Sequence, residues 1–306
     1  MANNKDITLG TSSFWITLIL LSFIWLFYLV IWSFQNDNIR GTILFTVFFG
    51  MIIAGIILSR FKMFSMGSWS ENSLAFTIGF LFWGLIQGFK PAATQATTEL
   101  TVTSLFSLTQ NQLFATIAGQ LPQYIEVLMS GFVIPVAEEI FWMFAIPYGM
   151  FSILKAASKR KLNLFGKKKS LSFLKNMWLQ ILLVIAVGST TFAFFHVGRE
   201  AFIAFIIGAI IFRSIMVGVV YTEKAYDWLK NLEIFVSFAV GAHIVNNLLA
   251  GGGIGLAMDI LKSQNTVVYI TIWVLAIAIA IGAIDEIIGI VSGEKKKRKE
   301  GQGVFS

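Results

Sequence analysis

Residues 125–150 read IEVLMSGFVIPVAEEIFWMFAIPYGM, an almost uninterrupted apolar stretch with Glu138 and Glu139 near its centre. About 20 consecutive apolar residues cross the hydrocarbon core of a bilayer as a helix, so this stretch is predicted to span a membrane. An ionisable side chain at membrane depth is costly and indicates a functional site by default. The stretch therefore predicts a transmembrane fold and the place in it where a function resides.

The whole chain has the same apolar character. Hydrophobic residues make up 57% of the 306 positions and charged residues 13%, with a mean hydropathy of +0.78. This balance is typical of polytopic membrane proteins. The first apolar run lacks a basic leader and a cleavage site, which favours a retained span. We predict an all-α fold of about eight transmembrane helices with a core of helices four to seven, the spans lying near residues 14–34, 42–59, 74–89, 125–150, 177–198, 201–222, 232–250 and 267–291.

The basic residues predict how these spans are oriented. Most of the 23 lysines and arginines fall in segments on the side of the two termini, above all in residues 155–175 and 295–299. Cytoplasmic loops carry such an excess, so both termini are predicted to be cytosolic in a multi-pass integral membrane protein. Short basic runs beside spans suit anionic lipid headgroups. The net charge of +7 therefore needs no nucleic-acid partner.

Two connections between spans have a composition of their own. The Thr- and Gln-rich segment 92–124 has apolar residues at helical spacing, which fits either an interfacial helix or a plain outer connection. The run Gly251–Gly253 follows a span and no strand, so it is predicted to be a turn and not a phosphate loop.

Both histidines of the chain lie in predicted spans and have a neighbour four residues away. Phe192 and His196 share one helix face, as do His243 and Asn247, with Asn246 a less favourable alternative. An imidazole beside a carboxamide supplies two donors for a developing oxyanion. A buried carboxyl such as those of the glutamate pair is suited to activate water. Purely structural hydrogen bonding of each group is the alternative.

The flanking prolines add to the expected site. Pro135 and Pro147 bracket the glutamate pair, and each removes a backbone donor from the helix. They are predicted to kink the helix and to free carbonyl groups, which opens room for water.

Several other chemistries are not supported by the sequence. The absence of cysteine excludes disulfides, thiolate metal sites and thiol nucleophiles. There is no His-Glu-x-x-His motif, no Gly-x-Ser-Gly motif, and Gly282–Asp285 is not a Gly-x-Gly-Asp motif. The remaining chemistry is water activated among carboxyl, imidazole and carboxamide groups.

Three polar clusters follow one another along the chain: Glu138 with Glu139, Phe192 with His196, and His243 with Asn247. In this order they resemble the motifs of the CAAX protease and bacteriocin-processing (CPBP) family of intramembrane endopeptidases, which includes the prenyl-protein proteases. The resemblance covers residues 125–250. It implies three units: residues 1–124 with three spans and an outer segment, a catalytic core at 125–250, and residues 251–306 with the last span and a basic cytosolic tail. The family usually has an arginine where this chain has Met143.

The resemblance also implies a role for each residue. Glu138 is expected to be the base, assisted by His196, while His243 and Asn247 stabilise the oxyanion. Glu139 and Phe192 are expected to support the site. The substrate would be a lipidated, CAAX-like, or hydrophobic peptide, and membrane lipids the other partners.

Cofactor requirement is left open by these residues. A metal-free mechanism is favoured, since nothing in the spacing demands a metal. In the metal-dependent alternative, Glu138, His196 and His243 would hold a zinc ion, which also lowers the pKa of its water.

Arg213 lies within the sixth predicted span, and Asp285 and Glu286 lie late in the eighth. They are predicted to form a structural ion pair, with snorkelling of the arginine as a related outcome. Alternatively, Arg213 replaces the missing arginine and contacts substrate or Glu139.

A different functional class is the alternative to a peptidase. Carboxylates and histidines inside a membrane also mark proton relays. The protein would then be a non-catalytic transporter, a proton-linked carrier or a scaffold built on a decayed protease core.

Overall fold

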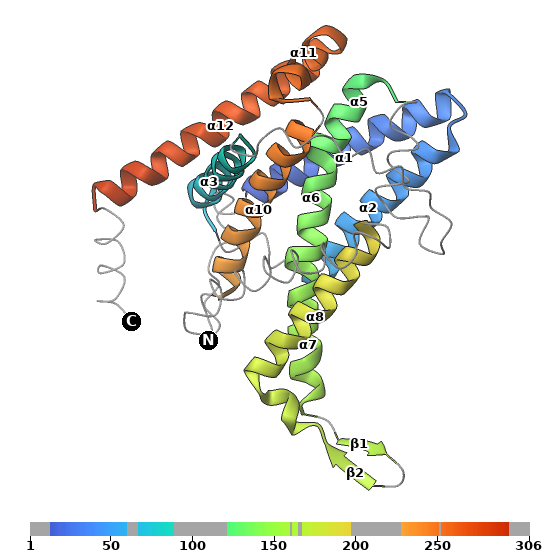
Figure 1. The fold of residues 1–306 in the computed structure, drawn as a ribbon, viewed down its shortest axis with the longest axis vertical. Coiled ribbons are helices and arrows are strands. Elements are labelled where there is room, and N and C mark those ends of the chain that lie inside the picture. Colours follow the sequence, from blue (N-terminus) through green and yellow to red (C-terminus); the bar gives the residue numbers. More distant parts are fainter. Residues whose placement is uncertain are drawn as a thin grey trace, which may run out of the picture.

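The computed structural model describes residues 13–59, 67–88, 121–159, 161–164, 167–196, 228–250 and 252–293. Figure 1 shows a helical fold with a single two-stranded hairpin in this part of the chain. Five helices in the described ranges are long and apolar enough to cross a membrane. The chain is therefore a multi-pass integral membrane protein.

Helices lie at the positions of the first three predicted spans, and the first two of these helices are among the five candidate membrane spans. Helix α1 (Ser13–Gln35) and helix α2 (Ile39–Ser59) form a hairpin, and helix α3 (Trp69–Gly88) follows. The turn between α1 and α2 contains Asp37 in the left-handed region, with φ of 49°. Aspartate tolerates this conformation better than most residues do, which suits it to a tight turn.

The stretch with the glutamate pair forms one continuous apolar helix of 35 residues, Gln123–Ala157. We call it the long helix. Its length exceeds that of an ordinary span, because about 20 residues suffice to cross a bilayer. It consists of α-helical and π-helical segments in turn: α5 (Gln123–Leu128), η2 (Met129–Val133), α6 (Ile134–Glu138), η3 (Glu139–Ala145) and α7 (Ile146–Ala157).

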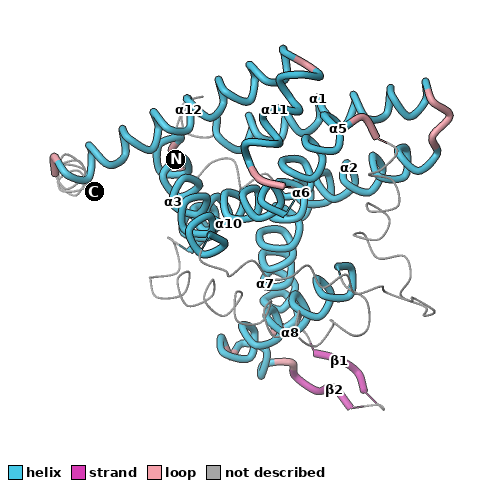
Figure 2. The backbone as a smooth tube through the Cα atoms, turned by 45° about the horizontal axis from the view of Figure 1, so that its top comes forward, coloured by secondary structure: helices cyan, strands magenta, loops and turns pink. Residues whose placement is uncertain are grey.

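The predicted all-α fold is confirmed, and a short β-hairpin follows the end of the long helix. Strands β1 (Lys161–Leu164) and β2 (Lys167–Ser170) pair antiparallel. The β1 sequence alternates polar and apolar residues, which is the period of a strand and not of a helix. A short 3-10 helix, η4 (Ser172–Lys175), then leads into α8 (Met177–His196), which returns alongside α7 (Figures 1 and 2).

The last described part holds three helices: α10 (Trp228–Ala250), α11 (Ile254–Gln264) and α12 (Thr266–Val291). Gly252 and Gly253 have φ of 109° and 101°, a backbone that favours glycine, so the predicted turn is confirmed at these two residues. Helix α11 was not predicted as a separate element. Asn265 caps α12 by accepting a hydrogen bond from the Val268 N–H at 3.1 Å.

Three sequence predictions fall outside the described residues. They concern the span at 201–222, most of the outer segment 92–124, and the basic tail at 295–299.

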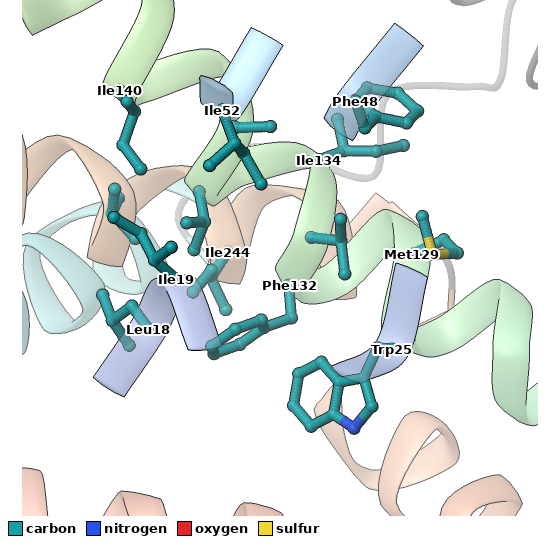
Figure 3. Packing of buried hydrophobic residues seen from close by; sticks show 14 of the residues in the cluster. Leu18, Ile19, Trp25, Phe48, Ile52, Met129, Phe132, Ile134, Ile140 and Ile244 are labelled. Carbon is teal, nitrogen blue, oxygen red and sulfur yellow. The ribbon is translucent and has the colours of Figure 1, made fainter. Parts of the chain in front are cut away.

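The hydrophobic core lies where α1, α2, the long helix and α10 meet. Figure 3 shows Leu18, Ile52, Phe132 and Ile244 pointing into the same buried volume from these four elements. Trp25 packs edge-to-face on Phe132 with ring centroids 4.6 Å apart. This packing fixes the long helix against its neighbours and so positions the glutamate pair.

Contacts along α10 show the relative directions of three helices. Asn72 of α3 bonds to Glu233 near the start of α10, and Trp83 bonds to Asn246 near its end, so α3 and α10 run parallel. The long helix runs in the opposite direction, because its Ser130 lies beside Asn247 and its Glu139 beside His243. These directions agree with the order of the predicted spans three, four and seven.

Candidate active site

Two prolines shape the long helix around the glutamate pair. A proline inside a helix has no N–H to donate, and its ring clashes with the preceding turn. Pro135 and Pro147 each lie two residues after the end of a π-helical segment, η2 and η3 respectively. The wider π turn accommodates the ring, so the helix continues from Gln123 to Ala157 instead of breaking.

The first of these π turns frees a backbone carbonyl. The Ile134 N–H donates to the Met129 carbonyl, five residues earlier. In this register the Ser130 carbonyl would need an N–H from Pro135, which proline lacks. It accepts instead from Asn247 Nδ2 at 2.8 Å. The freed carbonyl thus ties the long helix to α10.

Glu138 and Glu139 are both buried against α10, with exposed fractions of 2% and 7%. Glu139 Oε1 and His243 Nδ1 are joined by a hydrogen bond of 2.9 Å. On the other side of the ring, His243 Nε2 lies 3.8 Å from Glu138 Oε2. That distance allows an ion pair but is too long for a direct hydrogen bond. One imidazole therefore lies between two carboxylates.

This arrangement differs from what an ideal helix predicts. Adjacent α-helical residues point about 100° apart, so a regular α-helix would bring only one of the two carboxylates to the ring. A π-helical segment begins at Glu139 and widens the turn there. Both carboxylates can therefore reach the same ring, one at each nitrogen.

The carboxamide of Asn247 is held by a chain of hydrogen bonds from α3. Trp83 Nε1 donates to Asn246 Oδ1 at 3.0 Å, and Asn246 Nδ2 donates to Asn247 Oδ1 at 3.3 Å. A carboxamide nitrogen carries two N–H groups, so Asn247 has one besides the group that bonds to Ser130. Asn246, considered a lesser alternative in the sequence, is the link to α3.

Helix α8 approaches the long helix one turn from Glu138. Phe192 packs edge-to-face on Trp142 with ring centroids 6.0 Å apart. Helices α7 and α8 are antiparallel around the hairpin, so four residues forward on α8 correspond to four residues back on the long helix (Figure 1). The backbone of His196 is therefore near the level of Glu138. The His196 side chain lies outside what the structure describes.

The other predicted participants contribute less to this geometry. Arg213 lies outside the described residues, so its pairing with Asp285 or Glu286 stays a prediction. Glu286 is buried on α12 and Asp285 is exposed. Met143 is buried, with an exposed fraction of 5%. Among the described residues, no lysine or arginine forms an ion pair with Glu139.

The described residues supply part of a zinc-ligand set. His243 Nε2 and Glu138 Oε2 are donors of the kind that zinc binds. Within the described ranges, no group of three histidine or acidic side chains is arranged to hold a metal ion. In the metal-dependent alternative, a third ligand would come from His196.

A second buried polar cluster was not identified from the sequence. Glu233 is 1% exposed; its carboxylate accepts from the Gly67 N–H at 3.0 Å and from Asn72 Nδ2 at 2.9 Å. Ser237 Oγ donates to Asn72 Oδ1 at 2.7 Å. Glu233 lies ten residues before His243 on α10, about 15 Å along the helix axis. Its position just inside the predicted span 232–250 could have identified it from the sequence as a buried carboxylate.

Comparisons of this chain with models of protein families, with curated proteins and with solved structures find no match.

Proposed function

We propose that the protein is an intramembrane endopeptidase that hydrolyses a peptide bond of a lipidated or hydrophobic peptide. The observation that carries this proposal is the buried pair Glu138 and Glu139 in contact with His243 midway along an apolar helix. Burying two carboxylates at such a position is costly, and ionisable groups at membrane depth indicate a functional site by default. The resemblance of the motifs to those of the CPBP family supplies the reaction.

The proposed reaction uses Glu138 as a general base. Glu138 takes a proton from water, and the resulting hydroxide attacks the peptide carbonyl carbon. The carbonyl oxygen gains the negative charge and is stabilised by N–H donors of Asn247 and His243. Collapse breaks the C–N bond, and the proton passes from Glu138 to the leaving amine. His196 assists Glu138 in handling that proton.

The proposal includes the arrangement of the chain in the membrane. Eight spans cross it, the fourth to the seventh form the catalytic core, and both termini are cytosolic. The tied orientation of Asn247 and the level of the His196 backbone support a shared site for the three motifs.

Cleavage of a membrane-tethered reporter by purified protein tests the proposal. We expect wild-type protein to cleave the reporter, and Glu138→Ala and His196→Ala each to lose cleavage. Glu126→Ala is the matched control, because Glu126 lies on the same helix, twelve residues before Glu138. Equal cleavage by all four proteins would indicate a contaminating protease, and cleavage by none would refute the proposal.

A proton-linked carrier is the second candidate. Three buried carboxylates lie on α10 or against it: Glu233, Glu138 and Glu139. Such groups mark proton relays. Proton flux in proteoliposomes that is lost in Glu233→Gln, together with no cleavage of any reporter, would favour this function over the peptidase.

A further inference from the structure

We propose that Glu139 is the positioning residue for His243: it holds the ring so that Nδ1 carries a proton and Nε2 faces Glu138. The catalytic consequence rests on the proposed function, whereas the positioning itself does not. The inference concerns this chain in particular, because Met143 stands where the resembling family usually has an arginine.

The first step is the identity of the partner of Glu139. In the described part of the chain, its Oε1 bonds to His243 Nδ1 and its Oε2 is buried without a hydrogen-bond partner. A buried carboxylate needs a charged or hydrogen-bonding partner to offset lost hydration. At position 143 a thioether offers no donor for this purpose. Within the described ranges, His243 is therefore the group that stabilises the Glu139 carboxylate.

The second step is the effect on the ring. A carboxylate accepts hydrogen bonds and cannot donate one, so the nitrogen beside it is the protonated nitrogen. A carboxylate bonded to Nδ1 fixes both the tautomer and the orientation of an imidazole. The other nitrogen, Nε2, then lies on the Glu138 side at 3.8 Å.

The third step links this geometry to the proposed chemistry. Water activated by Glu138 and the oxyanion that follows must both lie near Glu138. Because Nδ1 is engaged by Glu139, Nε2 is the nitrogen that interacts with these reacting atoms, and it donates to the oxyanion when the ring carries a proton on both nitrogens. Loss of Glu139 would let the ring rotate or change tautomer, and the reaction would slow although Glu138 and His243 remain.

Nitrogen-15 NMR of histidine-labelled protein in detergent tests the positioning directly. The chain has only two histidines, so the His196→Gln variant leaves His243 as the one labelled imidazole. We expect Nδ1 of His243 to carry a proton in this background. Adding Glu139→Leu should abolish that preference, because leucine keeps the bulk and removes the acceptor. Adding Glu126→Leu, the control on the same helix, should leave the spectrum unchanged.

The outcomes separate this inference from the proposed function. An unprotonated Nδ1 in the His196→Gln background, or an unchanged spectrum on adding Glu139→Leu, would overturn the inference. If Glu139→Leu does not fold, Glu139→Asp gives the same test, since its carboxylate is shorter by one methylene. In protein with both histidines, we expect Glu139→Leu to lower reporter cleavage at least tenfold. The expected tautomer without any cleavage would refute the peptidase and leave the positioning role intact.

Discussion

Asn247 connects a backbone irregularity to the candidate chemistry. The π turn before Pro135 leaves the Ser130 carbonyl without a helical donor, and Asn247 supplies one. The same bond fixes the carboxamide for its proposed contact with the oxyanion. The residue therefore has a structural role and a proposed catalytic role, which one substitution tests together.

We predict that Asn247→Ala lowers the reporter-cleavage rate by about 100-fold, as loss of one oxyanion donor does. It should also destabilise the protein by about 1–3 kcal/mol, because the Ser130 carbonyl is left unsatisfied. Cleavage kinetics and thermal unfolding in detergent measure the two effects. Asn36→Ala, in the exposed turn after α1, is the control. A loss of stability with an unchanged cleavage rate would show that Asn247 takes no part in the reaction.

Individual site residues were predictable to different degrees. The motif spacing singled out Glu138, Glu139 and His243, and the structure brings these three together. The motif spacing did not predict that both carboxylates contact one ring, because a π turn at Glu139 has no sequence pattern comparable to amphipathic periodicity. Glu233 was missed because it lies at the edge of an apolar span.

At the scale of elements, the seam between α3 and α10 depends on two glycines. A Cβ atom added to Gly79 would meet the Phe238 carbonyl oxygen, and one added to Gly241 would meet the Phe76 carbonyl oxygen. Small residues let transmembrane helices approach this closely. The seam in turn places α10, with His243, against the long helix.

We predict that Gly241→Leu forces α3 and α10 apart and lowers the free energy of unfolding by about 3 kcal/mol or more, beyond the usual cost of overpacking. Thermal unfolding in detergent measures this loss. The control is Gly50→Ala on α2, where an added Cβ meets nothing within 4 Å. Equal stability of the two variants would contradict the close packing of this seam.

The helices themselves were largely predictable from apolar length. The predicted span 14–34 is one residue shorter than α1 at each end, and the predicted span 267–291 begins one residue after α12 does. Helix α3 begins five residues earlier than predicted, because its first turn contains polar Glu71 and Asn72. The β1–β2 hairpin was not predicted, because its segment was interpreted only from its basic charge, as a cytosolic connection.

At the scale of the whole molecule, the orientation in the membrane is predicted from the basic residues. The hairpin of β1 and β2 contains Lys167–Lys169 and lies at the end of the long helix, away from the α1–α2 turn (Figure 1). By the positive-inside rule we expect the hairpin to lie in the cytosol. The α1–α2 turn should then lie on the outer side.

The chain contains no cysteine, so single-cysteine variants report topology without background labelling. We predict that Asp37→Cys reacts with an impermeant maleimide added to intact cells. Lys168→Cys should react only after the membrane is opened. Labelling of both sites from the outside, or of neither after lysis, would contradict the predicted orientation.

In the proposed reaction, Glu138 activates water for peptide hydrolysis inside the membrane. Mass spectrometry of reporter fragments formed in oxygen-18 water tests this step, with wild-type protein and Glu138→Gln compared. We expect one oxygen-18 atom in the new carboxyl terminus with wild-type protein and no fragments with Glu138→Gln. Labelled fragments formed equally fast by Glu138→Gln would contradict it.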